Sequence, residues 1–329
     1  MPIPALSWPR TQRFDELDAK TRGTVHAAVA QQVAQMRIPV DMTPLVDALY
    51  VPMAAWLQAW RSAKSGPLIV GLTGGQGSGK STISALLRTV LEHGFGLRAA
   101  TLSIDDIYST RAERARLGRE IHPLLATRGP PATHDTGLGL RTLEALTSLR
   151  AGEVFAVPSF DKAVDDRRPE TEWPTVSGPV DVVLFEGWCV GASAEPDAAL
   201  LEPLNSLERT QDPQGRWRAH VNAALADDYR ALFNLVDVQV FLRISSMERV
   251  FEWRELQEAK LRKSVGASSN ADSELRVMDS QTVVRFVQHY ERITRHLLRE
   301  LPERAHLIVD INDAHQPSAV TINKPVATL

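Results

Sequence analysis

The sequence has one cysteine, no long apolar run and no large excess of either charge. Each of these absences excludes a class of protein. The single cysteine, Cys189, cannot form a disulfide within the chain. No run of eighteen apolar residues predicts a membrane span, and a formal net charge of −3 offers no basic field to nucleic acid. The first residues lack the basic and then apolar pattern of a secretion signal. We therefore expect a cytoplasmic protein whose partners include neither membrane nor nucleic acid.

The composition is that of an ordinary globular protein. Of the 329 residues, 43% are hydrophobic and 23% are charged, which is enough apolar material for a sizeable core. No internal repeat or low-complexity segment is present. We expect one large α/β domain over residues 66–316, preceded by a helical extension over 1–65 and followed by a loose tail over 317–329.

The strongest signal is a glycine-rich loop that matches the Walker A pattern. An apolar run over 68–72 predicts a strand before it, and apolar residues at helical spacing over 83–91 predict a helix after it. Backbone N–H groups of such a loop form a nest for phosphate oxygens at the helix N-terminus. We expect ATP to bind here, with Lys80 reaching its phosphates and the Ser81 hydroxyl binding Mg²⁺. The expected nucleotide-binding residues are Gly74, Gly75, Gln76, Gly77, Ser78, Gly79, Lys80, Ser81 and Thr82.

The residues before the first strand have the periodicity of helices. Apolar side chains recur on one face over 14–36 and again over 44–63, and Ile38-Pro39 separates the two segments. The second segment carries Met53 and Trp56 in its apolar stripe. Such a stripe usually packs into a core. The alternative is that it covers the substrate site or a second subunit, in which case these helices could hold an oligomer together.

Apolar runs alternate with helical segments along the rest of the chain. Runs that are apolar throughout are typical of a parallel sheet buried on both faces. We expect a five-stranded, doubly wound parallel sheet with helices on both faces and the ligand at the carboxyl ends of the strands. The five runs cover 68–72, 97–104, 180–185, 236–244 and 306–311.

A cation-rich helix is predicted to begin at Ser246 and to end in a polar loop over 264–273. We expect this helix to act as a lid that covers the triphosphate and excludes water. Its cations include Arg254, Lys260 and Arg262. Alternatively, the glutamates of this helix pair with its cations, and no lid is implied.

Carboxylates follow the second and third predicted strands. Phosphoryl transfer needs a group that accepts the proton of the attacking hydroxyl, and one of Asp105 and Asp106 is the candidate base. Asp105 and Asp106 could instead cap a helix. Glu186 ends the third strand, where a carboxylate holds Mg²⁺ or its water. Lys80, Glu186 and one of the two aspartates are therefore the expected catalytic residues, and Ser81 and Glu186 are the expected metal ligands.

Several segments together resemble the ATP-dependent D-glycerate 3-kinases, within the phosphoribulokinase, uridine kinase and pantothenate kinase group of P-loop kinases. The resemblance covers roughly residues 67–311. The segments that carry it are Gly74 to Thr82, Ser103 to Tyr108, Arg128-Gly129-x-Pro131-x-Thr133-His134-Asp135, Phe160-Asp161-Lys162 and Asp181 to Trp188.

The resemblance implies a P-loop kinase fold, MgATP as the donor and a hydroxyl of a small anionic substrate as the acceptor. It also implies that Asp105 is the catalytic base and that Glu186 lies on the metal side. Asp135 or Thr133 could equally cap the helix that follows them. The resemblance assigns to the acceptor side Asp106, Tyr108, Arg128, Thr133, His134, Asp135, Asp161, Lys162 and Arg167.

The chain departs from the family pattern in three places around the acceptor. Ile107 stands where an aromatic residue is usual, Phe160 where tyrosine is common, and Pro131-Ala132 where a Pro-Gly step is expected. We predict phosphorylation of D-glycerate to 3-phosphoglycerate. The alternatives are a related kinase acting on uridine, pantothenate or a sugar phosphate, and a non-catalytic ATP-binding regulatory module. A GTPase is disfavoured because no Asn-Lys-x-Asp motif is present.

Overall fold

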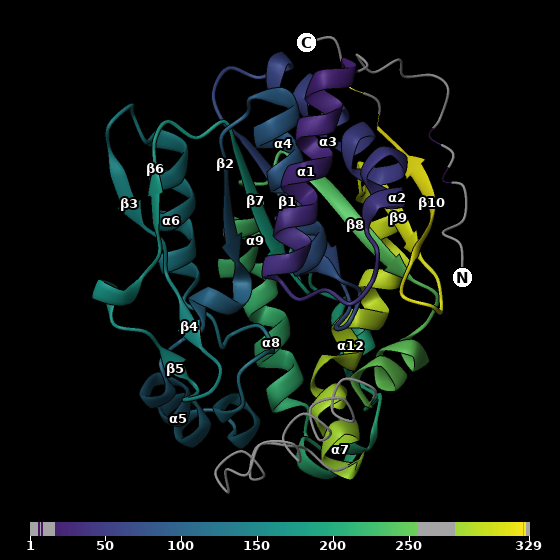
Figure 1. Ribbon diagram of the computed structural model, residues 1–329. Coiled ribbons are helices and arrows are strands. Elements are labelled where there is room, and N and C mark those ends of the chain that lie inside the picture. The colour runs from purple at the N-terminus through teal and green to yellow at the C-terminus, as the bar shows by residue number, and fades with distance from the viewer. Residues whose placement is uncertain (1–5, 7, 9–16, 256–279, 325, 327–329) are drawn as a thin grey trace, which may run out of the picture.

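The fold is an α/β sandwich built on one central sheet (Figure 1). The computed structural model describes residues 6, 8, 17–255, 280–324 and 326. Two of the expected lid cations, Lys260 and Arg262, lie outside the described residues. Among the described residues, no helix is both long and apolar enough to cross a membrane.

The central sheet has six strands in the order β10-β9-β8-β1-β7-β2. Five of them run parallel and occupy the five predicted runs, so the predicted doubly wound parallel sheet is confirmed. Their bounds are β1 (Leu68–Gly74), β2 (Ala99–Ser103), β7 (Val182–Gly187), β8 (Val238–Ile244) and β9 (Leu307–Ile311).

The sixth strand corrects one expectation. The tail predicted to be loose over 317–329 forms β10 (Pro317–Ile322), which pairs antiparallel with β9. Val320 is buried against the sheet, and the new strand satisfies backbone groups that β9 would otherwise expose at the sheet edge. An antiparallel edge strand needs only a short connection, here from 311 to 317.

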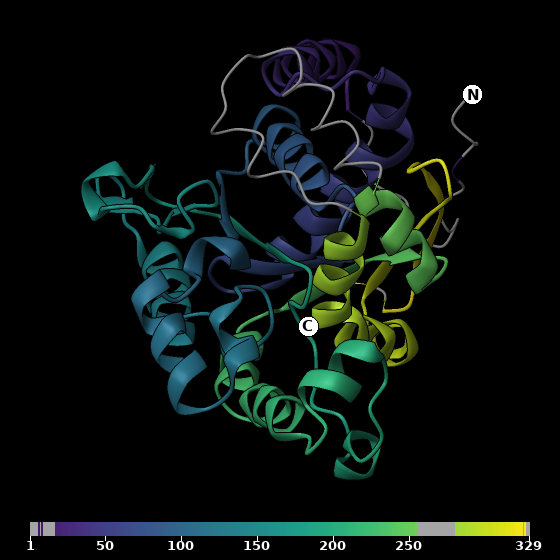
Figure 2. The ribbon, with the colours of Figure 1, turned by 90° about the horizontal axis from the view of Figure 1, so that it is seen from below.

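Alternate residues of each strand face two separate cores, which is why the strands are apolar throughout. Val70 and Leu72 belong to one core, and Ile69 belongs to the other. Seen from below in Figure 2, the purple and blue N-terminal helices lie on one side of the sheet and the green helices of residues 216–233 on the other. Both faces are therefore covered, as a doubly wound sheet requires.

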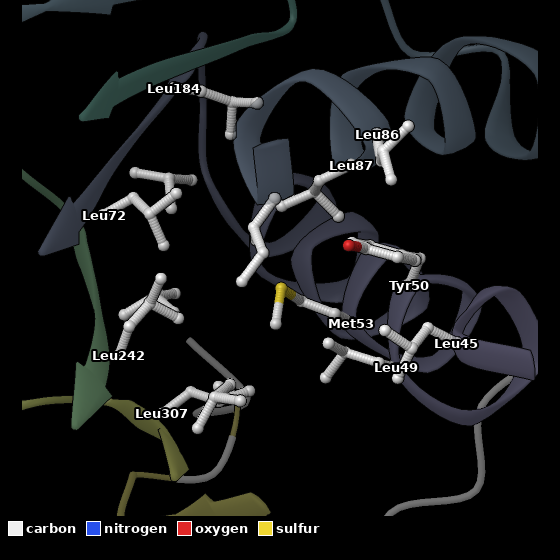
Figure 3. Packing of buried hydrophobic residues seen from close by; sticks show 14 of the residues in the cluster. Leu45, Leu49, Tyr50, Met53, Leu72, Leu86, Leu87, Leu184, Leu242 and Leu307 are labelled. Atoms are coloured by element: carbon white, nitrogen blue, oxygen red, sulfur yellow. The ribbon is translucent and has the colours of Figure 1, made fainter. Parts of the chain in front are cut away.

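The N-terminal helices share the first core with the sheet and with the helix after the glycine loop. Figure 3 shows Tyr50 and Met53 pointing toward Leu86 and Leu87 and toward strand residues such as Leu72. Met53 and Trp56 are fully buried, so the expectation that this stripe packs as core is confirmed. These two side chains pack within the chain, and an oligomer held together by the N-terminal helices stays a prediction. The elements here are α1 (Ala19–Gln35), α2 (Thr43–Leu45), η1 (Val46–Tyr50), α3 (Val51–Ala63) and α4 (Lys80–Phe95).

The opposite face carries the second core and the elements that surround the site. The helices and helical turns are η2 (Ile104–Ile107), α5 (Arg111–Glu120), η3 (Pro123–Ala126), α6 (Thr136–Ser148), η4 (Glu170–Glu172), η5 (Asp197–Leu200), α7 (Ser206–Gln211), α8 (Arg216–Ala226), α9 (Asp228–Phe233) and α12 (Ser280–Arg304). Two small hairpin sheets pair β3 (Val154–Ala156) with β6 (Thr175–Ser177) and β4 (Phe160–Asp161) with β5 (Asp166–Arg167). Residues 247–255 are also helical.

Candidate active site

The glycine loop connects β1 directly to α4. Gly77 and Gly79 have φ angles of 83° and 86°, in the left-handed region that glycine adopts without strain. At Gly74 an added Cβ would lie 2.6 Å from the Ser78 hydroxyl oxygen, so glycine is also required for space. The Lys80 ammonium donates to the Gly75 carbonyl at 3.1 Å and folds the loop back on itself. The loop therefore has the backbone conformation of a phosphate nest.

Unpaired polar groups of the loop fit a phosphate ligand. Gly79 caps α4 without a side-chain hydrogen bond, so no capping side chain occupies the amide groups of the first turn. The Ser78 hydroxyl and the Gln76 side-chain oxygen are buried and have no hydrogen-bond partner among the described residues. Burial lowers the pKa of Lys80, while the nearby charges of Glu186 and Asp105 act in the opposite direction.

Glu186 lies beside the start of α4 because β7 is the neighbour of β1. In the register of the sheet, Glu186 is opposite Leu72 on one side and Ser103 on the other. The Ser81 hydroxyl donates to Glu186 Oε1 at 2.9 Å, and Glu186 is only 6% exposed. The described residues contain no group of three or more histidine, cysteine or acidic side chains that could hold a metal alone. A hydroxyl next to a carboxylate fits Mg²⁺, which commonly completes its coordination with phosphate oxygens and water.

Asp105 follows β2 on the first turn of η2 and faces the same region. Tyr108 donates its hydroxyl proton to Asp105 Oδ1 at 2.8 Å, and the Lys162 ammonium lies 2.5 Å from Oδ2. Burial would raise the pKa of Asp105, but the charge of Lys162 and the two hydrogen bonds hold it below its usual value. Asp105 is therefore a carboxylate, and Ser103 rather than either aspartate caps the turn.

These groups meet in a cavity of about 470 Å³ at the carboxyl ends of β1, β2 and β7. Ten of the expected site residues line it, and so do Gly187, Trp188, Phe286 and Tyr290, which were not expected. Trp188 directly follows the Glu186-Gly187 strand end, whereas nothing local distinguishes the two aromatic residues of α12. The lining consists of Gln76, Gly77, Lys80, Ser81, Asp105, Tyr108, Arg128, Lys162, Glu186, Gly187, Trp188, Arg254, Phe286 and Tyr290.

Arg128 is held in the cavity wall by an ion pair and an aromatic ring. Its guanidinium pairs with Asp165 and lies 5.7 Å from the centre of the Phe160 ring. The backbone at and just after Arg128 is also fixed, since Tyr290 of α12 donates to the Arg128 carbonyl at 3.2 Å and Trp188, which follows β7, donates to the Gly129 carbonyl at 3.2 Å. The cation is thus positioned before any ligand arrives.

The lid cation that the structure describes, Arg254, also lines this cavity. Its guanidinium lies 5.0 Å from the centre of the Phe286 ring. On the same helix Arg249 pairs with Glu252 at 2.6 Å and with Asp313 at 2.8 Å, so some of the pairing expected as the alternative is present as well.

Several residues expected on the acceptor side support the cavity wall instead of lining it. The Thr133 hydroxyl donates to the Pro130 carbonyl at 2.6 Å and closes the turn that follows Arg128. Asp135 caps α6 by accepting from the Leu138 amide at 2.8 Å and pairs with Arg167 at 3.3 Å. Asp135 therefore caps α6, as the alternative states, and each of its carboxylate oxygens already accepts one hydrogen bond.

Four further expected residues lie behind the same wall. Asp106 accepts from the Phe160 amide at 3.1 Å, and Arg167 donates to the Tyr108 carbonyl at 2.9 Å. Asp161 accepts from Arg168 at 2.7 Å. The His134 ring stacks on Tyr108 with 4.4 Å between ring centres. None of these four residues lines the cavity, and their contact with the acceptor stays a prediction.

His134 is buried and hydrogen-bonded on one nitrogen. Its Nδ1 lies 2.5 Å from the Tyr229 hydroxyl, and burial lowers its pKa to about 3. The ring is therefore neutral and acts as a flat surface that fixes the Tyr108 ring. Since Tyr108 holds Asp105, His134 influences the site through the orientation of that carboxylate.

No protein-family model matches the chain. Over 251 residues it is 32% identical to the uncharacterized kinase mug58 of Schizosaccharomyces pombe, covering 73% of this chain and 84% of that protein. It is 28% identical over 312 residues to the chloroplastic D-glycerate 3-kinase of Arabidopsis thaliana, covering 87% of this chain but only 63% of the relative. The solved D-glycerate 3-kinase of Cryptococcus neoformans var. grubii superposes with a TM-score of 0.64 at 25% identity, covering 93% of this chain and 99% of that one.

Proposed function

Because this chain belongs to the D-glycerate 3-kinase family of P-loop kinases, we propose that it transfers the γ-phosphate of ATP to D-glycerate, giving 3-phosphoglycerate and ADP. The observation that best supports this reaction is the position of Asp105. A carboxylate held by Lys162 and Tyr108 lines the same cavity as the phosphate loop. In-line transfer requires such a group next to the attacking hydroxyl.

Asp105 acts as the base that orients the acceptor hydroxyl. Each carboxylate oxygen can accept two hydrogen bonds, so the bonds from Tyr108 and Lys162 leave capacity on both oxygens. The lowered pKa keeps the group ionised at neutral pH. Because its pKa is low, Asp105 does not take the hydroxyl proton before the reaction. It takes that proton as the hydroxyl oxygen bonds to phosphorus.

The phosphate loop, Lys80, Ser81 and Glu186 hold the donor. The loop amides bind phosphate oxygens, and the Lys80 ammonium provides a buried positive charge beside them. Ser81 and Glu186 would hold Mg²⁺, directly or through water, and the ion supplies positive charge to the phosphates when it is bound.

Arg128 and Lys162 are the cations that suit an anionic acceptor. Both line the cavity beside Asp105, and Arg128 presents a planar fork that matches a carboxylate. Arg254, from the helical segment 247–255, adds a further positive charge to the cavity and excludes water when the donor is bound. A cavity of about 470 Å³ suits a triphosphate tail with a three-carbon acid.

The direct test is a coupled ADP-release assay with D-glycerate, uridine, pantothenate and ribulose 5-phosphate as acceptors. Turnover with another acceptor and none with D-glycerate would reject the proposed substrate. Asp105→Asn is expected to lower kcat by about 10²–10⁴-fold and to leave the Kd for ATP unchanged. Asp197→Asn, at an exposed aspartate of η5, is the matched control. Full activity of Asp105→Asn with retained ATP binding would favour a regulatory nucleotide-binding module.

We also propose a cytoplasmic location. The free thiol of Cys189 is fully buried, and burial raises its pKa, so it is inert packing that fits a reducing compartment.

A further inference from the structure

A second cavity, of about 550 Å³, lies on the α9 and α12 side of the sheet. It is formed by α9, the C-terminal end of α12, the start of β8 and the segment that follows β7. It shares no lining residue with the candidate active site. Its polar and charged lining includes Ser193, Arg230, Gln239, Arg304, His306 and Lys324.

The charges of this second cavity are all of one sign. Arg230, Arg304 and Lys324 line it, and no aspartate or glutamate does. Arg304 is partly neutralised by Glu300 and is fixed by a bond to the Gly191 carbonyl at 2.7 Å. Arg230 and Lys324 make no ion pair within the described part of the chain, which leaves two uncompensated positive charges.

Hydrogen bonds fix the backbone next to Lys324 and the ring of His306. The side-chain amide of Asn323 donates to the Pro302 carbonyl at 2.7 Å and to the Ala305 carbonyl at 3.1 Å, which anchors Lys324 at the turn between α12 and β9. His306 Nδ1 accepts a hydrogen bond from the backbone amide of Gln239 at 3.1 Å.

His306 is neutral at physiological pH. Burial and the charge of Lys324 lower its pKa to about 4. Since Nδ1 accepts a hydrogen bond, the proton of the neutral ring is on Nε2, which makes that nitrogen a donor. An anion that reached Nε2 would therefore meet a neutral donor.

We propose that this second cavity binds a small anion that carries a phosphate or a carboxylate group. Arg230 and Lys324 line the same cavity, and neither makes an ion pair within the described residues, so their charges repel one another and a bound anion would offset that repulsion. Guanidinium groups bind both kinds of oxyanion through paired hydrogen bonds. The volume exceeds that of a single phosphate and has room for a phosphorylated or carboxylated metabolite.

The floor of the second cavity is connected to the phosphate loop. The Gln239 side chain donates to the Gly71 carbonyl at 3.2 Å and to the Thr73 hydroxyl at 2.8 Å. Thr73 directly precedes Gly74 in β1. An anion in this cavity would therefore lie behind the strand that carries the loop, at a site separate from the one where substrates react.

The test is a titration of the full-length protein with inorganic phosphate at constant ionic strength, followed through the ring nitrogens of His306 by NMR. We expect a saturable shift in the wild type and in Arg209→Gln, a control that removes an exposed cation from α7. The double variant Arg230→Gln/Lys324→Gln should raise the Kd by about tenfold or more. Phosphate at the glycine loop cannot mimic this result, because these residues do not line that site.

A second titration with succinate identifies the group that is recognised. Saturable binding of phosphate or of succinate supports the proposal and assigns the oxyanion. If neither ligand shifts His306, or if the double variant binds as tightly as the wild type, the proposal is wrong. Both substituted residues are exposed, and the double variant Arg230→Lys/Lys324→Arg, which keeps both charges, should bind like the wild type.

Discussion

Asp106 makes the stability of this protein depend on pH in a way that can be measured. Its carboxylate accepts from the Phe160 amide at 3.1 Å and makes no ion pair with a cation of the described residues. Burial, opposed by that hydrogen bond and aided by the charge of Asp105, raises its pKa from 3.8 to about 6. The folded state therefore binds this proton more tightly than the unfolded state does.

The sign and size of the effect follow from linkage. Because the pKa in the folded protein is the higher one, this group lowers the free energy of unfolding as pH rises from about 4 to about 6. The shift from 3.8 to about 6 corresponds to about 3 kcal/mol. Asp106→Asn keeps an oxygen for the Phe160 amide and has no charge to bury. We therefore expect it to stabilise the protein by about 2–3 kcal/mol at pH 7.5 and by little at pH 4.

Chemical denaturation followed by tryptophan fluorescence, at several pH values between 4 and 7.5, measures this difference. The comparison is between wild type and variant at each pH, so that other titrating groups cancel. Asp197→Asn removes an exposed carboxylate and controls for the change in net charge. The reasoning would be refuted if the difference in unfolding free energy between Asp106→Asn and wild type were the same at pH 4 and pH 7.5. It would also be refuted if the variant were less stable than wild type at pH 7.5.

Three further predictions concern the loop after Arg128, the metal side and the N-terminal helices. Ala132 has a φ of 74°, which costs an L-residue about 1 kcal/mol, so Ala132→Gly should raise the free energy of unfolding by about 0.5–1 kcal/mol in urea titrations. Glu186→Gln keeps the acceptor for Ser81 but removes the charge, and should raise the Mg²⁺ concentration for half-maximal activity by about 10–100-fold. An unchanged Mg²⁺ requirement would contradict this role. Met53→Ala should cost about 2–5 kcal/mol in denaturant titrations, whereas Leu201→Ala, at a side chain 75% exposed, should change stability by under about 0.5 kcal/mol.

Much of the fold could be predicted because its signals are local. Five apolar runs predicted five buried parallel strands, and the loop over 74–82 predicted the turn into α4. The sixth strand could not be predicted, because β10 depends on the free edge of β9 and not on its own short alternating sequence. The stripe of Met53 and Trp56 predicted a core, while its partners in α4 and the sheet came only from the structure.

The candidate site was predictable where a residue type and a strand end coincide. Glu186 and Asp105 each follow a strand, and the order β2-β7-β1 brings both to the phosphate loop. Their chemical roles stay predictions. Motif positions alone could not separate residues that line the cavity, such as Arg128 and Lys162, from residues that support it, such as Thr133.

By itself, the sequence determined the phosphate loop, the strand-by-strand pattern of the sheet and which strand ends carry carboxylates, because each depends on neighbours a few residues apart. The tertiary structure alone decided that Tyr108 and Lys162 hold Asp105, that Tyr290 and Phe286 of α12 close the cavity, and that a second group of cations gathers behind β1 and β8. These contacts join residues that are distant in the chain. Their partners are selected by packing and charge in the folded protein, which no local pattern records.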